Sequence, residues 1–392
     1  MGDEWIETTL GEVLTLQRGF DLPVSKRLLG PYPVVASTGE VGKHNEALVR
    51  GPGVVIGRSG SIGGGQYIKS DFWPLNTTLW VKDFKGNDPR FCYYLVKSVD
   101  FSRFNAGSGV PTLNRNHIHP LPVNVPASLP EQRAIAAILG ALDDKIELNR
   151  RMNETLEAMA QALFKSWFVD FDPFREQGME DSPLGPIPMG WRVGIVNDLG
   201  AMICGKTPPT QDHDNYGGNI PFITIPDMHG KVFVTVTGSY LSPKGASTQP
   251  KKLLPQNAVC VSCIATPGLV ALTSQPSHTN QQINSVVCDS TTSPYWCYLA
   301  MTNLRQEIIT GGAGGSATLN LNKAEFSKLQ LVKPNSETMW NFHSLVEALF
   351  SRILSNDLES NNLANIRDTL LPKLLSGETL VKDTEKFVET VS

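Results

Sequence analysis

The first residues that could carry chemistry lie in the segment Gly200–Thr207, which fits the spacing G-x-x-x-x-G-K-[ST] of a nucleotide-binding P-loop. A P-loop works because a helix opens directly after it and points its backbone N–H groups at phosphate. Here Pro208 and Pro209 follow at once, and the residue before a proline is pushed out of the helical region. We therefore expect no nucleotide site at Lys206.

Two weaker patterns suggest metal binding or methyl transfer. Cys260 and Cys263 form a C-x-x-C pair, but the sequence has no second such pair, and both thiols lie in an apolar run typical of a buried strand. We expect buried free thiols rather than a metal site. The segment Asp172–Phe174 lacks one proline of the [DN]PP[FY] tetrapeptide with which amino-methyltransferases hold a target base. Because no catalytic constellation remains, the sequence favours a binding protein over an enzyme.

The chain is organised around one long helix, which the sequence predicts over Leu129–Phe168. Ser128 and Glu131 form a capping box at its start, and Pro130 stands in the first turn, where its missing N–H is not needed. An apolar stripe with a period of seven residues runs along it and contains Leu142, Asn149, Leu156 and Leu163. A stripe of this kind requires a partner helix.

The same chain provides the partner. The segment Trp340–Leu375 carries a second stripe with the same period, which contains Leu349, Asn356, Leu363 and Leu370. Each of these residues lies 207 positions after its counterpart in the first stripe, so the two asparagines match. A buried asparagine in such a seam fixes the register of the helices at a cost in stability. We predict an antiparallel coiled coil; the alternative for each asparagine is a solvated helix position.

The segments between the helices repeat as well. Trp5 and Gly19 recur as Trp191 and Gly205, Phe91–Leu95 as Tyr295–Leu299, and Thr112–Asn114 as Thr318–Asn320. The sequence therefore predicts an internal duplication of a globular domain followed by a long helix. The predicted boundaries are a first domain at 1–128, a central helical spacer at 129–172, a Pro-rich linker at 173–190, a second domain at 191–335, a C-terminal helical spacer at 336–380 and a tail at 381–392.

Both globular parts are predicted to be rich in β-strands, which makes the fold class α+β. Short apolar runs between Gly, Pro and Asn turns indicate strands at 32–36, 53–57, 79–81, 121–125, 221–225, 231–237, 258–264 and 283–287. A short helix is expected at Arg90–Val99, with its counterpart at Tyr295–Ile309.

Composition narrows the class of protein further. The chain has 392 residues, a formal net charge of −4 and no run of 18 apolar residues, so we expect neither a membrane span nor a signal peptide but a cytoplasmic protein. Six cysteines in a chain of this length do not make a disulfide framework. The two globular parts are weakly basic and the two helical parts acidic, a pattern compatible with contact to nucleic acid.

The segment Leu129–Phe168 resembles the central helical region of the specificity subunits of type I restriction–modification enzymes. The linker Ser182–Trp191, the segment Gly205–Met228 and the helix end Thr369–Glu378 are similar to later parts of the same family, in the same order. The resemblance implies a non-catalytic DNA reader with two target-recognition domains and a bipartite, asymmetric target. It also implies two adenine-methylating modification subunits, and restriction (motor–nuclease) subunits, as partners. AdoMet, ATP and Mg²⁺ would then belong to those partners.

Given this resemblance, polar and basic residues on glycine-rich loops are the candidates for contact with DNA, because arginine can read guanine and amides can read adenine. In the first domain these are Arg58, Ser59, Ser61, Lys69, Asn76, Thr77, Thr78, Arg103, Ser108 and Arg115. In the second domain they are Lys206, Thr266, Thr279, Asn280, Gln281, Gln282, Ser316 and Lys323. Asn114 and Asn320 are instead expected to cap helices, since both halves keep them.

The acidic outer faces of the helices are the predicted docking surface for modification subunits, with Asp143 and Asp144 exposed and Glu147 paired to Arg151. Two alternatives stay open within the binding class: an orphan or type II-like specificity subunit that supports methylation only, and a two-domain scaffold that never touches DNA.

Overall fold

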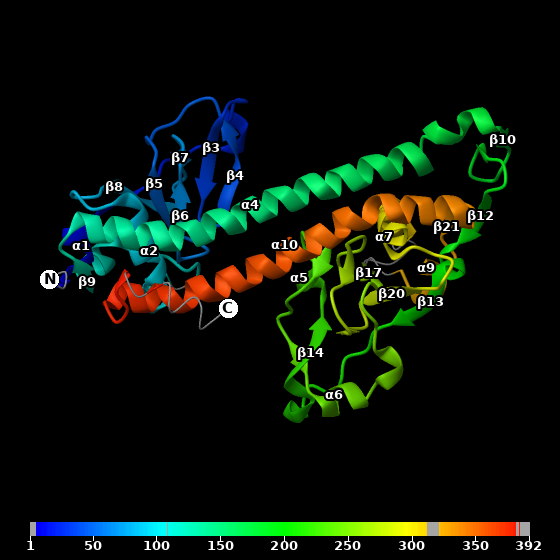
Figure 1. Ribbon diagram of the computed structural model, residues 1–392. Helices are drawn as coiled ribbons and strands as arrows, with labels where there is room; N and C mark the ends of the chain where they lie inside the picture. The colour runs from blue at the N-terminus through cyan, green and yellow to red at the C-terminus, as the bar shows by residue number, and fades with distance from the viewer. Residues whose placement is uncertain (1–4, 108, 312–320, 382–383, 385–392) are drawn as a thin grey trace. The chain divides into compact units, whose positions relative to one another are not determined.

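The computed structural model describes residues 5–107, 109–311, 321–381 and 384. The chain divides into two compact units, which comprise residues 1–146 with 362–392 and residues 147–361. Each unit contains one β-rich domain and part of each of two long helices, α4 (Leu129–Phe168) and α10 (Ser336–Ser376) (Figure 1). No helix within the described ranges has the length and apolar character that crossing a membrane requires.

The long helices begin where their capping residues place them. In α4 the Ser128 hydroxyl accepts a hydrogen bond from the Glu131 N–H (3.5 Å), and the helix has the predicted bounds. In α10 the Asn335 side chain accepts from the Thr338 N–H (2.9 Å), and the helix starts at Ser336, four residues before the heptad stripe begins at Trp340. It ends before Gly377, whose φ of 74° suits a glycine after a helix.

The two helices pack against each other within each unit. In the first unit Ile135 and Leu139 of α4 share a core with Leu370 and Leu374 of α10. In the second unit the Phe168 ring lies 4.8 Å from that of Phe342, between centroids. Residue numbers rise along α4 while those of the contacted residues fall along α10, so the predicted antiparallel packing of the helices is confirmed.

The matched asparagines lie inside this helix pair, in the second unit. Asn149 and Asn356 are 0% and 1% exposed. The Asn149 amide donates to Glu359 Oε2 (2.8 Å), and the Asn356 amide donates to Asn153 Oδ1 (2.8 Å). The Oδ1 atoms of both asparagines are buried without a hydrogen-bond partner, which is unfavourable. The position in the helix pair that Asn149 and Asn356 occupy thus has the properties of one that sets the register and lowers stability.

The rest of the stripe is buried to different degrees. Leu370 is fully buried, whereas Leu142, Leu156, Leu163, Leu349 and Leu363 are half-buried. Met159 of α4 is 49% exposed and does not belong to the buried part of the stripe. Both helices also bury a second face against a globular domain, and Ala160 and Phe164 lie deeper there than the heptad positions do.

Replacement of Asn149 with leucine is expected to raise the thermal unfolding temperature. The change removes one unpartnered buried acceptor, worth about 1–3 kcal/mol, and about 1 kcal/mol corresponds to roughly 2–4 °C in a unit of this size. The same change removes the polar group that fixes register, so additional associated species should appear in sedimentation. Asn341→Leu on the exposed face of α10 is the control. A less stable Asn149→Leu variant that stays a single species would contradict this assignment.

The described residues of the first unit form nine strands in three sheets. The strands are β1 (Trp5–Thr9), β2 (Thr15–Arg18), β3 (Tyr32–Ala36), β4 (Gly39–His44), β5 (Gly53–Gly57), β6 (Gly63–Ile68), β7 (Trp73–Pro74), β8 (Thr78–Asp83) and β9 (Pro122–Pro126) among the described residues. The helices are α1 (Leu10–Val13), α2 (Pro89–Ser98) and α3 (Arg115–Ile118), with 3-10 turns η1 (Val24–Lys26) and η2 (Phe101–Phe104). The sheets have the orders β1-β9, β2-β8-β5-β6 and β4-β3-β7, in which β3 and β7 pair in parallel.

The second unit repeats this plan with insertions. Its strands are β10 (Met179–Glu180), β11 (Ile187–Pro188), β12 (Arg192–Ile195), β13 (Gly200–Cys204), β14 (Tyr216–Ile223), β15 (Phe233–Val234), β16 (Tyr240–Leu241), β17 (Val259–Ser262), β18 (Val270–Thr273), β19 (His278–Thr279), β20 (Ile283–Cys288) and β21 (Gln330–Lys333). Its helices are α5 (Ile225–Met228), α6 (Pro243–Ser247), α7 (Pro294–Asn303), α8 (Arg305–Gly311) and α9 (Lys323–Phe326), with turns η3 (Asp172–Gln177), η4 (Val196–Leu199), η5 (His213–Asn215) and η6 (Pro250–Lys252).

Strand order confirms the predicted duplication. The sheets β12-β21, β13-β20-β17-β18-β15 and β16-β14-β19 of the second unit repeat the three sheets of the first, with β15 as an added edge strand, and β14 and β19 again form a parallel pair. Gly19 and Gly205 hold the same place: a Cβ at Gly19 would lie 2.2 Å from the Leu75 carbonyl oxygen, and one at Gly205 would lie 2.1 Å from that of Asn280. Both positions therefore need glycine, because another strand passes too close for a side chain.

The structure corrects the alignment of the two halves in detail. Asn114 caps α3 as predicted, by accepting from the Asn116 N–H (3.0 Å), but the residue that caps α9 is Asn322. Asn320, named for that role, lies outside the described residues. Cys92 in α2 corresponds to Cys297 in α7, one position away from the predicted match, because both helices begin at a proline after their cap.

Two predicted elements of the second unit are also shorter than expected. The predicted helix over 295–309 is divided at Leu304 into α7 and α8. The predicted strand at 231–237 is reduced to the two residues of β15, which pair with β18 only at Phe233 and Val234.

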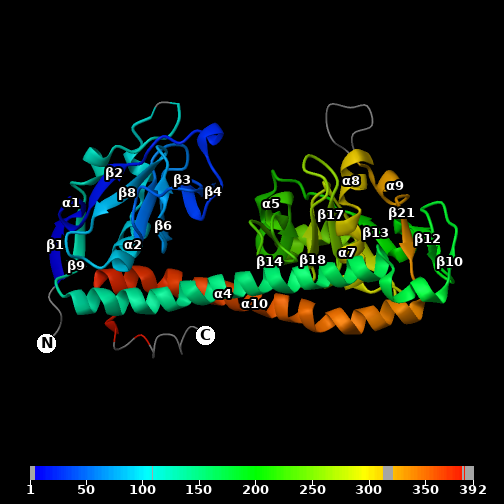
Figure 2. The same ribbon diagram turned by 90° about the horizontal axis from the view of Figure 1, so that it is seen from above.

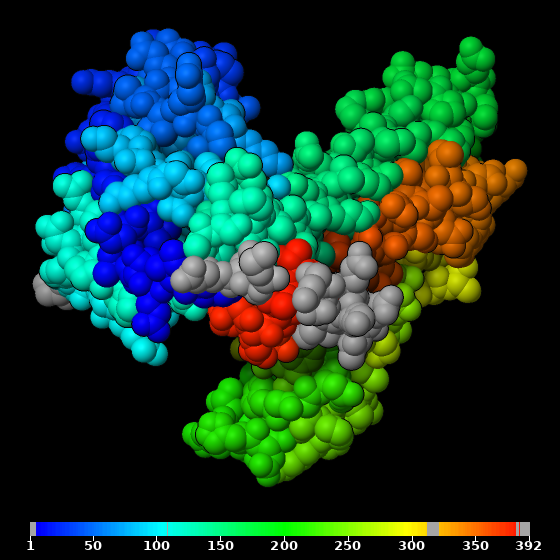
Figure 3. Space-filling model, turned by 60° about the vertical axis from the view of Figure 1, so that its left-hand side comes forward, coloured from blue at the N-terminus to red at the C-terminus, as the bar shows by residue number. Residues whose placement is uncertain are grey.

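Each domain shares its hydrophobic core with the long helices. In the first unit Phe91 and Leu95 of α2 pack with α4 and α10 residues, and Figure 2 shows α2 between the sheet and the helices. In the second unit α7 takes the same position, with Trp296 and Met301 in the core. At the end of α10, Gly377 lies against the indole of Trp5, and Figure 3 shows these last turns, in red, at the surface of the first unit.

Candidate nucleic-acid interface

A basic cleft opens at one end of the strands in the first unit. It has a volume of about 910 Å³, and its lining includes Arg18, Arg58, Lys82 and Arg115 together with Asp21. Arg18 ends β2, Arg58 follows β5, Lys82 lies in β8 and Arg115 begins α3. Four cations on four elements therefore converge on one cavity.

Arg58 is held in this cleft by its neighbours. Its backbone N–H donates to the Thr77 carbonyl (2.8 Å), its guanidinium donates to the Asn76 carbonyl (3.1 Å), and its own carbonyl accepts from Leu113 N–H (2.8 Å). Burial and the nearby Arg18 lower the pKa of Arg58. Like charges brought together in this way are relieved by a bound anion such as a phosphate.

Several predicted candidates border this cleft. The Ser59 N–H donates to the Thr77 carbonyl (3.1 Å), and Asn76 donates to the Asp21 carboxylate. Ser61 is exposed in the turn after Ser59. Arg103 is more remote: it lies on η2 and pairs with Asp100 (3.3 Å) with 82% of its side chain exposed. Ser108 lies outside the described residues.

One candidate of the first domain, Thr78, is corrected, and a second, Lys69, has a partner outside the cleft. Thr78 is fully buried, and its hydroxyl donates to the Leu75 carbonyl (2.7 Å), so it presents nothing at the surface. Lys69 donates to the Asp144 carboxylate of α4 (2.9 Å), so its ammonium is directed to the helix rather than to the cleft.

The equivalent strand ends of the second unit bring amides together with two lysines. Lys206 follows β13 and is exposed, Gln281 and Gln282 precede β20, and Lys323 begins α9. The Cys263 N–H donates to the Gln282 carbonyl (2.9 Å), and the Cys263 carbonyl accepts from Leu321 N–H (2.9 Å), which joins these segments at one edge. Cys263 thus takes the place that Arg58 has in the first unit. Thr266 is exposed in the turn after β17.

Two candidates of the second domain, Thr279 and Asn280, do not present side chains there. Thr279 is fully buried and Asn280 is 9% exposed, which contradicts their placement at the surface. The Asn280 amide instead donates to Gln282 Oε1 (3.0 Å) and holds that side chain. Ser316 lies outside the described residues.

Sequence reasoning missed Arg18 and Lys82. Both lie in strands, whereas the candidates predicted from the sequence were residues of glycine-rich loops. The repeated glycine could have identified Arg18 in the sequence, because Arg18 directly precedes Gly19.

The segment that fits the P-loop spacing does not form a phosphate cradle. Gly200–Cys204 is the strand β13, and no helix follows Lys206. The Gly205 N–H donates to the Ile283 carbonyl (3.1 Å) and the Lys206 N–H to that of Thr279 (3.0 Å), so these donors are already occupied.

The C-x-x-C thiols lie in different environments. Cys260 belongs to the core cluster with Ile223 and Leu254, whereas Cys263 belongs to the cluster with the long helices, as expected for an odd offset in a strand. Burial raises the pKa of Cys260 to about 12 and that of Cys263 to about 11, which disfavours metal-binding thiolates. Phe174 of the segment Asp172–Phe174 packs in the core, 4.9 Å from the Trp191 ring.

The carboxylates predicted to dock partner subunits are engaged within the first unit. Asp143 accepts from Tyr94 (2.6 Å) and Arg367 (2.6 Å), and Asp144 accepts from Arg90 (2.9 Å). Both carboxylates therefore have partners within the chain, although the side chain of Asp144 is still 45% exposed, and docking of a modification subunit at this face stays a prediction. The predicted pair Glu147–Arg151 is present in the second unit at 3.6 Å.

Comparison with known proteins agrees with this architecture. A model of the family described as type I restriction modification DNA specificity domain matches residues 2–158 and 188–366. The chain belongs to this family of specificity subunits, the non-catalytic components that determine the DNA target of type I restriction–modification enzymes.

Individual relatives cover nearly the whole chain. The type I restriction enzyme HindI specificity subunit of Haemophilus influenzae is 33% identical, over 96% of this chain and 99% of its own. The MjaIX specificity subunit of Methanocaldococcus jannaschii is 27% identical, over 79% and 74%. The crystal structure of a type I S subunit from M. genitalium shares the fold, with a TM-score of 0.63, 15% identity and coverage of 95% and 96%.

Proposed function

We propose that this specificity subunit reads a bipartite, asymmetric DNA target, with one half-site for residues 1–128 and the other for residues 191–335. The observation that carries the proposal is the pair of equivalent strand-end surfaces with different side chains. The first presents arginines, which suit phosphates and guanine edges, and the second presents glutamines, which suit adenine. Two different surfaces on one repeated framework imply two different half-sites separated by unread base pairs.

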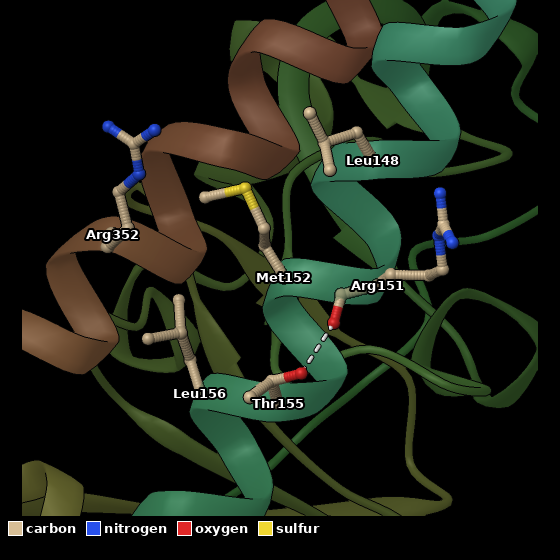
Figure 4. A pocket seen from close by; sticks show the side chains of 6 residues that line it. All are labelled: Leu148, Arg151, Met152, Thr155, Leu156 and Arg352. Carbon is tan, nitrogen blue, oxygen red and sulfur yellow. Dashed lines mark hydrogen bonds between the residues drawn. The ribbon is translucent and has the colours of Figure 1, made fainter.

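The subunit would act in a complex in the cytoplasm. Two modification subunits would bring AdoMet and methylate adenine, and restriction subunits would bring ATP and Mg²⁺. We place the dock for a modification subunit at a groove in the second unit, between α4 and α10 (Figure 4). The groove has a volume of about 390 Å³ and is lined by the apolar Leu148, Met152 and Leu156, with Arg151 and Arg352 beside them.

The shape and charge of the groove suit one kind of occupant. Leu148 is 45% exposed although it is apolar, and an amphipathic helix would cover it. Arg352, together with Arg151 beside its partner Glu147 (3.6 Å), would attract acidic residues next to an apolar stripe. We therefore assign this groove to an amphipathic segment of the modification subunit with acidic flanks.

Loss of the cleft arginines tests DNA reading. The methylated motif is first mapped in cells that contain this subunit and its modification subunit. Binding of the reconstituted complex to a duplex with that motif is then measured against salt concentration. Arg58→Ala and Arg115→Ala should each weaken binding and lower the slope of log K against log salt by about one, because each removes one phosphate contact.

Lys43→Ala, a lysine of β4 outside the cleft, is the matched control and should change neither quantity. An unchanged slope in both arginine variants would exclude the cleft as the DNA surface. A protein-binding scaffold predicts no salt-dependent DNA affinity at all, and an orphan or type II-like subunit predicts methylation without restriction.

A further inference from the structure

The contacts between a recognition domain and the long helices differ in chemical character between the two units. In the first unit ion pairs accompany the apolar core. In the second unit Tyr295 of α7 stacks on Phe350 of α10 with centroids 4.5 Å apart and planes 9° from parallel, and the Tyr298 hydroxyl donates to Glu157 of α4 (2.9 Å). Arg90 holds the position in α2 that Tyr295 holds in α7, the second residue of the helix. The difference therefore lies at equivalent places.

Two carboxylates of α4 form the centre of the ionic contact. Asp144 accepts from Arg90 of α2 (2.9 Å) and from Lys69 after β6 (2.9 Å). Asp143 accepts from the buried Tyr94 hydroxyl (2.6 Å) and from Arg367 of α10 (2.6 Å). We call these six residues the carboxylate clamp. It joins the first domain to both long helices.

The contacts of Arg90 in the carboxylate clamp require a defined position of its guanidinium on α4. The Arg90 guanidinium also donates to the Gly140 carbonyl (2.9 Å), and a Cβ at Gly140 would lie 2.4 Å from its Cζ. Gly140, the only glycine in α4 (Leu129–Phe168), thus leaves room for the planar guanidinium to lie directly on the helix backbone. The hydrogen bond from Arg90, followed by that from Lys69, lowers the pKa of Asp144 to about 2, so the carboxylate stays charged at neutral pH.

We propose that the carboxylate clamp sets the angle at which the first domain is held on the helices, and thereby the number of unread base pairs that the subunit accepts between its half-sites. This inference rests on the proposed function. The planar Arg90 guanidinium donates to two separate acceptors on α4, Asp144 and the Gly140 carbonyl, and such a contact restrains orientation more than apolar packing does, because hydrogen bonds are directional. The clamp residues are positioning residues that need not touch DNA.

Methylation mapping of the complex with its modification subunit tests the clamp. In Asp144→Ala both half-sites should stay unchanged, while the fraction of methylation at spacers one base pair too long or too short rises about five- to tenfold, as expected from the loss of two partly exposed ion pairs. Asp144→Glu should restore most of the selectivity. Glu154→Ala, which removes an exposed carboxylate paired with Arg150 on the same helix, should leave the spacer unchanged.

The outcomes separate the two proposals. If the wild-type complex methylates no motif with two half-sites, the proposed function fails regardless of the clamp. If the wild type has one spacer length and Asp144→Ala keeps it as strictly, the clamp proposal fails. Lys69→Met removes only a 70% exposed partner and should give a smaller shift in a fully folded subunit. If Asp144→Ala does not fold, Lys69→Met becomes the deciding variant. The clamp proposal is then overturned if Lys69→Met methylates only the spacer length that the wild type methylates.

Discussion

Exchange of residues 1–128 for the corresponding domain of a relative is expected to replace one half-site of the DNA target and to leave the other as it was. Each mismatched base pair lowers binding by about 1–3 kcal/mol, so a half-site with several changes should lose methylation at the old motif completely. The second half-site should persist because the strand-end residues of the second unit, such as Gln281 and Lys323, are not altered. Methylated adenines mapped across a genome measure both halves at once.

The exchange needs a matched control, because the first domain shares its core with the helices. One chimera should carry the relative's domain unchanged, and a second should restore Arg90 and Tyr94, which contact Asp144 and Asp143. Both should read the new half-site, and the second should fold and assemble better. A chimera that alters both half-sites together would exclude the assignment of one half-site to each domain.

The helices and the duplication could be predicted because their signals are spread along the chain. The seven-residue period continues through Asn149 and Asn356, so the match between the two stripes does not depend on any single side chain. The repeated Gly19 and Gly205 marked a close approach of strands that a Cβ would block. Such constraints act locally and are visible in sequence.

The recognition surface could be located only approximately. Glycine-rich loops led to Arg58 and Thr77, but Thr78, one residue later, is fully buried at the start of β8. Side chains alternate between the faces of a strand, so an error of one residue reverses the assignment. Sequence alone does not fix the exact residue at which a strand begins.

Partners that are distant in sequence explain why Asp143 and Asp144 are less free than their sequence pattern suggested. Their charge and helical phase suggested an exposed acidic face, but Tyr94 and Arg90 lie about 50 residues earlier and Arg367 lies on the other helix. Only the packing of α2 on α4 brings these groups together. The acidic balance of the helices therefore includes carboxylates that are engaged in internal ion pairs.

If the modification subunit binds the groove at Leu148, as proposed, Leu148→Glu is expected to weaken assembly with it strongly. A carboxylate placed in a desolvated apolar contact should weaken binding by about 2–4 kcal/mol, which is roughly 30- to 1000-fold. The substitution lies at a 45% exposed helical position, so the free subunit should keep its unfolding temperature. Co-purification and sedimentation of the mixed subunits measure the loss.

Met159→Glu provides the matched control for this substitution. Met159 lies on the same helix, is 49% exposed and does not line the groove, so the same added charge there should leave assembly intact. If both variants assemble normally, the modification subunit binds elsewhere on the chain. If both fail to the same degree, the added negative charge on α4 rather than the apolar groove determines docking. Loss of assembly in Leu148→Glu alone would show that apolar side chains of the modification subunit bind in the groove.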